Sequence, residues 1–516
     1  MTQTVARDAS TVTTWNLVSR ITGFARVVVV GGALGATRLG DSYQASNQVS
    51  NILFEFLAAG TLSAVLIPGV VARLSDGSRA RAEAFAGALL ARALVVLGAT
   101  AAVGMAFAHP IMRALLAGNH SGTRDAEVRL GAFLLLFVLP QLVLYGWSAV
   151  VTAVLHSEGR FAAAAAAPVG NNVIVIATLG AFWVRGASGL HLGAVDRLLL
   201  GGGLLGGVLC MTLLPVIAAR RAGLHVGPVW RTDEAVGASL RDALWASLIV
   251  VPEQLFLLGS LVVAGRVDGG VVACQIAFTV FLLPHALLGQ PLATVLYPRV
   301  ARAWARDERT SVRDDAANGL RVLLLLTAPA AGLLVGLAVP ATRVIAVGAL
   351  ARSTGPVLVA AALAGYAVGL TGYSWFLYLA RVSYATGDVR TPGIVALVAG
   401  VGGTALLGVA TGSAGSALLY RVGLAHSVMM LCAAAGVLGV LARRGVVDLS
   451  LRPWCAAAAA AVSCGVVARV VGDHVGGAGR GGAVVALGVA GAVGALVYAA
   501  LAWVGGARPA DFAGSR

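Results

Sequence analysis

Residues Thr14–Ala36 read TWNLVSRITGFARVVVVGGALGA, a stretch that is apolar except for two arginines and a few small polar side chains. A helix of about 20 apolar residues crosses the hydrocarbon core of a bilayer, which is roughly 30 Å thick. Thirteen further apolar segments follow, so the sequence predicts an all-α polytopic membrane protein of about fourteen transmembrane helices. The predicted segments cover residues 12–36, 43–72, 84–108, 129–155, 161–184, 196–219, 238–265, 270–300, 319–341, 355–380, 391–411, 415–442, 455–471 and 482–505.

The composition agrees with this class. Hydrophobic residues make up 59% of the 516-residue chain and charged residues only 11%, whereas a soluble domain has about 25% charged residues. The net charge is +15, and all 37 basic residues are arginine. These arginines lie mainly in short loops rather than on one solvated basic face, which argues against nucleic-acid binding.

Loop arginines predict the topology. If the N-terminus is cytoplasmic, 22 arginines lie in inner loops and termini and 12 lie in outer loops. Short cytoplasmic loops are enriched in basic residues. We therefore expect a multi-pass protein of the inner (plasma) membrane with both termini in the cytoplasm.

The motifs that would indicate catalysis are missing. The chain has no GxxxxGK[ST], HExxH or GxSxG motif, so we expect a protein that is not an enzyme and has no cofactor or metal site. The cysteines lie in apolar runs without a CxxC pair, as expected of small buried hydrophobic side chains. They are Cys210, Cys274, Cys432, Cys455 and Cys464.

An internal repeat predicts the domain organisation. Thr61–Pro68 reads TLSAVLIP and Pro291–Pro298 reads PLATVLYP, an offset of 230 residues, and Val-Ala-Arg follows each proline. A shift of six helices keeps the membrane orientation, and parallel repeats of this kind form two lobes that rock around a central site. We expect two pseudo-symmetric six-helix lobes around a central cavity, at 1–222 and 223–445, and a C-terminal helix pair with a short tail at 446–516.

Two arginines in the first segment are expensive to place in a membrane. Arg20 and Arg26 each cost about 2.5–3.5 kcal/mol near the centre of a helix. A water-filled cavity would remove this cost, and the planar guanidinium group suits phosphate, especially a diphosphate. The alternatives are arginines that snorkel to the interface or that pair with Asp41 or Glu55.

Three other polar or small positions accompany these arginines. Gly23 lies between them, where it permits bending or close approach of the helix or only helix packing. Asp41 follows the outer turn at Gly35–Gly40, and it is expected either to cap the second helix or to act as an outward gate. The paired asparagines Asn171 and Asn172 are typical of residues that hold helices together.

Glu55 and Glu253 are the acids placed deepest in apolar runs. Ionisable groups at membrane depth are candidate proton or cation sites, so both are candidates for coupling or gating. Glu253 follows a proline and precedes Gln254, which suggests a helix break with a second polar contact. The 230-residue repeat aligns Glu55 with His285, so each lobe places one titratable group at the same point.

Five stretches resemble the MurJ/MviN family of lipid II flippases, in the multidrug/oligosaccharidyl-lipid/polysaccharide exporter superfamily. The resemblance covers residues 10–445. It is carried by Ser19–Arg26 (SRITGFAR), Asp41 after a GAT turn, Gly60–Pro68 (GTLSAVLIP), Tyr384–Pro392 (YATGDVRTP) and Gly412–Leu418 (GSAGSAL).

The resemblance implies a flippase of the bacterial inner membrane that carries an undecaprenyl-diphosphate-linked disaccharide-pentapeptide outward for peptidoglycan assembly. It implies that Arg20 and Arg26 bind the diphosphate and that Asp41 is needed for function. Membrane lipids and cell-wall synthesis proteins are the expected partners, no cofactor is expected, and an ion or the membrane potential would assist export.

The chain departs from the family pattern at several positions. The family carries an arginine where Phe54 or Glu55 stands, another at Thr279, a proline at Arg381 and an arginine at Thr386. These departures leave two alternatives open. One is export of another polyprenyl-linked glycan or a small amphiphile, and the other is a non-transporting scaffold of the cell-wall machinery.

Overall fold

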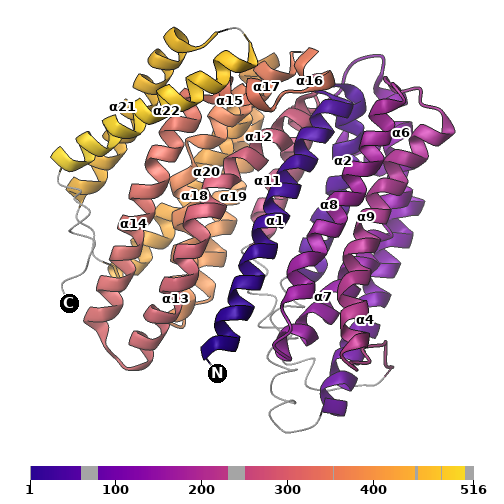
Figure 1. The fold of residues 1–516 in the computed structure, drawn as a ribbon, viewed down its shortest axis with the longest axis horizontal. Helices are drawn as coiled ribbons and strands as arrows, with labels where there is room; N and C mark the ends of the chain where they lie inside the picture. The colour runs from indigo at the N-terminus through magenta and orange to yellow at the C-terminus, as the bar shows by residue number, and fades with distance from the viewer. Residues whose placement is uncertain are drawn as a thin grey trace. The chain divides into compact units, whose positions relative to one another are not determined.

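The computed structural model describes residues 2–59, 79–230, 250–352, 354–447, 451–477 and 479–505, and these residues form helices joined by turns and loops without a strand (Figure 1). The chain folds as two compact units. Unit 1 comprises Met1–Gln254 with Val347–Ala349, and unit 2 comprises Leu255–Ala346 with Leu350–Arg516. The predicted division at residues 222 and 445 stays a prediction.

The first turn of α11 (Val251–Ala264) belongs to unit 1. Its other elements are α1 (Thr2–Leu34), α2 (Arg38–Phe54), the π-helix η1 (Glu55–Ala59), α4 (Arg79–Ala106), α5 (Ala108–Leu115), α6 (Arg124–Val138), α7 (Gln141–Ser157), α8 (Ala162–Val184) and α9 (Ala194–Arg221).

Unit 2 contains the rest of α11 and most of the short α16 (Gly348–Arg352). Its other elements are α12 (Gly270–Pro284), the π-helix η2 (His285–Gly289), α13 (Gln290–Ala305), α14 (Arg309–Gly336), α15 (Ala338–Ile345), α17 (Gly355–Ala367), α18 (Leu370–Ala385), α19 (Arg390–Ala410), α20 (Gly415–Arg443), α21 (Leu451–Val475) and α22 (Arg480–Val504).

The chain is a multi-pass membrane protein. Within the described residues, 11 helices are long and apolar enough to cross a membrane, or up to 12 if the bent pair α17–α18 is one span. The second and seventh predicted segments run partly through residues outside the described ones. The all-helical membrane class is therefore confirmed, whereas the count of fourteen stays a prediction.

The structure confirms the internal repeat beyond the motif that revealed it. α4 and α14, like α5 and α15, have first and last residues 230 positions apart. The two π-helices obey the same offset. The motif at Thr61–Pro68 itself lies outside the described residues. The repeat therefore extends from the sequence motif to the order and bounds of the helices in the two units.

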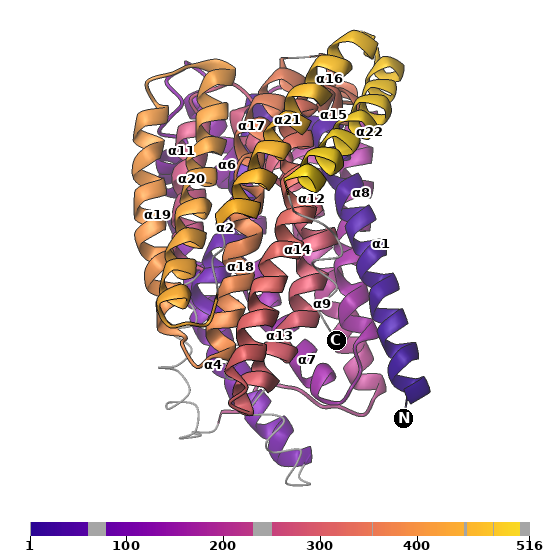
Figure 2. The same cartoon turned by 90° about the vertical axis from the view of Figure 1, so that its left-hand side faces the viewer.

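In unit 1, α1, α8 and α9 pack side by side (Figure 2). The Asn172 amide donates to the Ser19 carbonyl oxygen of α1 at 3.3 Å and to the Thr22 hydroxyl at 3.1 Å. A Cβ atom on Gly207 would lie against the Asn171 side chain, so α9 approaches α8 through glycine. Asn172 thus holds two helices together as predicted, and small residues allow close packing.

In unit 2, the C-terminal helices α21 and α22 lie side by side and pack against α14 (Figure 1). A Cβ atom on Gly332 or Gly336 would collide with the α21 backbone at Ala461 or Gly465. The helices can therefore approach this closely only because these positions have no side chain. Buried Leu324, Cys464 and Tyr498 form the core beside this crossing.

The two short helices α5 and α15 were not expected from the sequence, which predicted loops between segments 3 and 4 and between segments 9 and 10. Each follows a long spanning helix after a single residue. Their buried faces include Met112 in α5 and Thr342 in α15. Helices this short escape a search for apolar blocks of 20 residues because they cannot cross the bilayer.

Candidate functional site

Both predicted arginines lie well inside the membrane-spanning part of α1. This span runs from Thr11 to Leu34, and a helix rises 1.5 Å per residue, which places Arg26 about 12 Å from the Leu34 end and Arg20 about 14 Å from the Thr11 end. Both side chains are half-buried. Neither arginine is therefore at the edge of the span, where snorkelling is easiest.

The six-residue spacing sets the directions of the two arginines. At 3.6 residues per turn, Arg20 and Arg26 lie about 120° apart around α1, with Gly23 between them. A Cβ atom on Gly23 would lie 3.5 Å from the Asn172 amide nitrogen of α8. The glycine therefore faces the packed side of α1, and the arginines flank that side.

Arg26 interacts electrostatically with two tyrosines. Its charge acts electrostatically on the hydroxyls of Tyr43 in α2 and Tyr145 in α7. Among the described residues, Arg26 makes no ion pair and no hydrogen bond. Among the described residues, Arg26 is therefore not paired with Asp41 or Glu55, which was one of the alternatives.

A polar network beside Tyr145 was missed by the sequence analysis. The Tyr145 hydroxyl donates to Asn51 at 3.4 Å and to Gln141 at 3.5 Å. The Asn51 amide donates to Gln48 at 3.1 Å, and the Ser50 hydroxyl donates to Gln141 at 3.4 Å. The signal was present in the sequence, because residues 41–51 read DSYQASNQVSN, an unusually polar run for a membrane helix.

Asp41 does not cap its helix, which corrects one of the two alternatives predicted for it. The N-cap of α2 is Thr37, whose hydroxyl accepts a weak hydrogen bond from the Gly40 backbone N–H at 3.4 Å. Asp41 lies in the first turn and its side chain is fully buried. A buried acid near a helix N-terminus is favoured by the helix dipole.

Glu55 and Glu253 are brought together in unit 1. Glu55 is the first residue of η1, and its charge acts on the Glu253 carboxyl in the first turn of α11. Both side chains are half-buried. π-Helical turns occur often at functional sites. Two carboxyl groups that interact electrostatically favour sharing one proton or holding a cation.

Gln254 directly follows Glu253 in α11 and belongs to unit 1, whereas His285 belongs to unit 2. The Gln254 side chain is half-buried, and its backbone N–H donates to the Val250 carbonyl oxygen at 3.2 Å. His285 begins η2 in unit 2, where its Nδ1 atom and the Ser374 hydroxyl are 2.9 Å apart. The repeat thus places Glu55 and His285 at the first position of matching π-helices.

Thr279 is one of the positions that depart from the family pattern, and its hydroxyl forms a hydrogen bond within its own helix. The Thr279 hydroxyl donates to the Gln275 carbonyl oxygen of its own helix at 2.9 Å. A threonine that bonds within its own turn presents no charge to a ligand. Unit 2 therefore has no cationic side chain at this point of α12.

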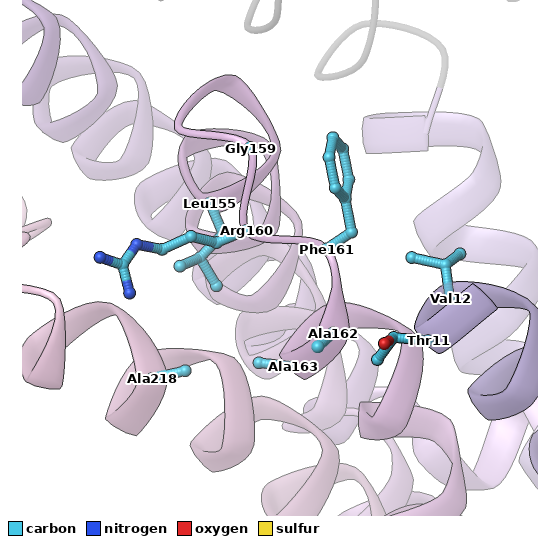
Figure 3. A pocket seen from close by; sticks show the side chains of 9 residues that line it. All are labelled: Thr11, Val12, Leu155, Gly159, Arg160, Phe161, Ala162, Ala163 and Ala218. Carbon is cyan, nitrogen blue, oxygen red and sulfur yellow. The ribbon is translucent and has the colours of Figure 1, made fainter. Parts of the chain in front are cut away.

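The described part of unit 1 has surface hollows that lie away from the predicted residues. One, of about 290 Å³, lies where α1, α7, α8 and α9 meet, and Arg160 and Phe161 are among its lining residues (Figure 3). Another, of about 310 Å³, lies beside Trp147 and Arg220. Neither includes a predicted site residue. No group of three or more His, Cys, Asp or Glu side chains able to hold a metal occurs in the described residues.

The chain is similar to known proteins over most of its length. The model of the family described as "Lipid II flippase MurJ" matches residues 30–472. The lipid II flippase MurJ of Burkholderia cenocepacia is 29% identical over 405 residues, covering 76% of this chain and 75% of that protein. The probable lipid II flippase MurJ of Rickettsia prowazekii is 23% identical, covering 73% and 72%.

Solved structures show the same fold. A lipid II flippase MurJ in an inward closed conformation has a TM-score of 0.76 at 18% identity, covering 96% of this chain and 99% of that one. A multidrug resistance MATE family transporter of the MOP superfamily in an inward-facing conformation has a TM-score of 0.67 at 13% identity, covering 82% and 94%. At these identities the likeness concerns the fold alone.

Proposed function

The chain belongs to the MurJ family of lipid II flippases, and from this premise we propose how it holds and moves its substrate. As a flippase it carries lipid II, the undecaprenyl-diphosphate-linked precursor of peptidoglycan, from the inner to the outer leaflet of the bacterial inner membrane by alternating access. Flipping changes no covalent bond, so the binding of the anionic headgroup is the central chemical problem.

The observation that carries the proposal is the state of Arg26. It lies about 12 Å inside the span, and its described surroundings offer it two tyrosine hydroxyls but no acid. A guanidinium group at this depth needs an anion or water to offset its desolvation. The diphosphate supplies two phosphates that match the guanidinium fork, so Arg26 binds the diphosphate directly.

Arg20 and Asp41 have separate roles in this scheme. Arg20 lies about 9 Å further along α1 and about 120° around it, so it contacts the second phosphate or the first sugar only when the headgroup spans the packed side of the helix. Asp41 is buried near the outer end of the same helical hairpin. It gates the outer side by attracting a basic group in one conformation and releasing it in another.

The paired carboxyls supply coupling. Glu55 and Glu253 interact within unit 1, and protonation of one relieves the repulsion between them. Gln254, next in sequence, offers an amide that can bond to either carboxyl. Gly23 lets α1 bend beside the site, and His285 provides the matching titratable group in unit 2. The coupling ion is a proton or a metal cation, and the inside-negative potential drives the anionic headgroup outward.

The expected topology places both termini in the cytoplasm, because the predicted inner loops hold most of the arginines. Membrane lipids surround the spanning helices, and cell-wall synthesis proteins are the partners to which the flipped precursor passes. No nucleic acid takes part.

Complementation tests the proposal. A bacterium whose lipid II flippase is depleted receives this chain as wild type, Arg26→Ala or Arg26→Lys, with Arg302→Ala as a control. Arg302 is exposed and its Nε atom donates to the Pro298 carbonyl oxygen of its own helix, so its loss leaves the site intact. We expect rescue by the wild type and the control, weak rescue by Arg26→Lys, which keeps the charge without the fork, and none by Arg26→Ala.

The other outcomes identify what fails. Rescue by Arg26→Ala at normal expression would remove the diphosphate site while leaving the flippase assignment intact. A wild-type protein that reaches the membrane but does not rescue would favour another polyprenyl-linked cargo or a scaffold role. A vesicle assay of flipping with fluorescent lipid II, read as loss of fluorescence on adding a membrane-impermeant quencher, separates those two.

A further inference from the structure

His426 of α20 is a buried imidazole without a hydrogen-bond partner. Its side chain is 2% exposed, and neither ring nitrogen has a hydrogen-bond partner among the described residues. The next residue fixes its position, because the Ser427 hydroxyl contacts the Gly365 and Tyr366 carbonyl oxygens of α17 at 2.7 and 2.9 Å. A buried polar ring with both nitrogens unpaired is costly, so its presence calls for a physical reason.

Five aromatic rings surround this imidazole, and we call them the aromatic box. Their centroids lie 5.3–6.2 Å from that of His426, and four of the five meet it edge to face. The box consists of Phe256, Phe278, Phe281, Tyr366 and Tyr373. Every ring belongs to unit 2, although they come from α11, α12, α17 and α18.

The side chains around His426 would do little to stabilise a protonated imidazole while the box is closed. The titratable groups that face it are Tyr366, whose hydroxyl shares a hydrogen bond with Cys274, then Tyr373, and His285 behind Tyr373. The described ring contacts include no acid and no arginine. Ring faces attract a cation, but burying a charge without a counter-ion costs more than such contacts return. The closed box therefore holds the neutral imidazole.

Two of the five rings are less enclosed than the other three. Tyr373 and Phe278 are only half-buried, whereas Phe256, Phe281 and Tyr366 are fully buried. The Tyr373 ring packs perpendicular to His285 with centroids 5.0 Å apart. His285 begins η2, and single π-helical turns occur frequently at functional sites. Tyr373 thus lies between the two histidines, next to this irregular turn.

We propose that His426 is a proton-binding site of unit 2 and that proton binding opens the aromatic box. A proton that binds far better to the hydrated imidazole than to the enclosed one shifts the equilibrium toward the open conformation. The direction of the linkage follows: acidification opens the box, and alkaline conditions close it. The site goes beyond the proposed lipid function because proton binding here needs no lipid substrate.

Hydrogen–deuterium exchange of the full-length protein in nanodiscs tests this without substrate. The experiment compares pH 5.5 with pH 7.5, with labelling times corrected for the intrinsic pH dependence of exchange, and follows peptides that contain Phe278–Phe281, Tyr366–Ser374 and Ala425–Met430. A solvated imidazole titrates at about 6.5, so the open population should rise about tenfold over this range. Exchange in these peptides should rise accordingly.

The variants assign the response to one residue. His426→Phe fills the box with an uncharged ring and should abolish the pH response. His426→Gln places a polar side chain that does not titrate in this pH range, and it should also abolish the response. The glutamine variant serves as the test if the phenylalanine variant folds poorly. His474→Phe is the control, because His474 is exposed on α21 and should leave the response intact.

Three results would overturn the proposal. They are equal exchange at both pH values in the wild type, a response that survives in either His426 variant, and a response lost in His285→Phe but kept in His426→Gln, which would place the proton on His285. Failure of lipid flipping in the complementation experiment leaves each of these readouts unchanged.

Discussion

Helix α2 of unit 1 and its repeat partner α12 of unit 2 have the same backbone arrangement, but polar side chains in α2 correspond to aromatic rings in α12. α2 and α12 both run into a five-residue π-helix, and the two π-helices begin 230 residues apart. The same offset aligns Gln48 with Phe278 and Asn51 with Phe281. In α2 the aligned side chains share a hydrogen bond of 3.1 Å. In α12 their counterparts are rings with centroids 5.6 Å apart.

This difference teaches that the repeat fixes the backbone while each unit uses it differently. Polar side chains within a membrane helix are costly and are usually kept for function. Unit 1 keeps them beside Arg26 and Tyr145, where an anionic headgroup is proposed to bind. Unit 2 replaces them with rings that pack and exclude water. Headgroup binding is therefore expected to depend on the polar groups of α2, whereas the aligned positions of α12 contribute packing.

The largest effect on stability is expected when a polar side chain from α2 replaces the aligned aromatic ring in α12. Phe281→Asn removes a fully buried ring and leaves an amide in an apolar site, which should lower the free energy of unfolding by about 3–5 kcal/mol. Thermal unfolding of the purified protein in detergent measures this. Phe281→Leu is the control and should cost much less. Equal losses for both variants would show that polarity does not matter in the box.

The reverse change in unit 1 should affect transport more than stability. Gln141 is fully buried with an unpaired Nε2 atom, so Gln141→Leu removes an unsatisfied donor together with two weak contacts from Tyr145 and Ser50. Stability should change by less than about 1 kcal/mol. Flipping in vesicles should fall about tenfold because Tyr145 loses its orientation beside Arg26. A large loss of stability with normal flipping would contradict the functional reading of this network.

A loop outside the spans gives a smaller, pH-dependent effect. Desolvation alone would raise the pKa of Asp388, but hydrogen bonds from Thr391 and the charge of Arg444 outweigh it and lower the pKa below its usual value. The stability that Asp388 contributes is thus complete above the unfolded-state pKa of about 3.9 and is lost as the pH falls through the lower folded-state pKa.

Asp388→Asn should therefore cost about 1 kcal/mol at pH 7, since the carboxylate is partly shielded but the Arg444 side chain is 37% exposed, so that solvent weakens the ion pair. The difference from wild type should disappear as the pH falls well below 4. Thermal unfolding across pH 3–7 measures it. A difference that persists unchanged at the lowest pH would exclude the ionised carboxylate as its cause.

The smallest effect concerns the bend of α1. A Cβ atom at Gly23 would lie 3.5 Å from Asn172, an ordinary contact, so Gly23→Ala should change stability by no more than about 1 kcal/mol and in the stabilising direction. Gly203→Ala is the contrast, because its Cβ would collide with the Thr178 side chain. If α1 must bend during transport, Gly23→Ala slows flipping without loss of stability; unchanged flipping would leave Gly23 as a packing residue.

The membrane class, most of the spanning helices and the repeat could be predicted from the sequence. Long apolar blocks must become helices because lipid offers the backbone no hydrogen-bond partners. The break between α17 and α18 could not be predicted in this way. There a bend of 47° separates the helices, and Gly369 lies so close to Ser427 of α20 that a Cβ atom would collide. Such a bend depends on a neighbour that is 58 residues away in the sequence.

The candidate site was only partly predictable. Arg26, Glu55 and Glu253 could be predicted as site residues because a charge in an apolar run is expensive wherever the helix packs, and their roles stay predictions. Tyr145 and Gln141 were missed because neutral polar groups cost less and do not stand out from their segment. The capping alternative for Asp41 was wrong because Thr37 occupies that position.

By itself, the sequence determined that this chain enters a membrane as a duplicated set of helices with cationic groups on the first, because hydrophobicity and charge act residue by residue, whatever the final packing. Only the tertiary structure decided that the charge of Arg26 acts on Tyr43 and Tyr145, that Glu55 interacts with Glu253, and that His426 is enclosed by five rings. Those encounters join helices distant in sequence, and the free energy that selects them comes from side-chain contacts that exist only after the helices have packed.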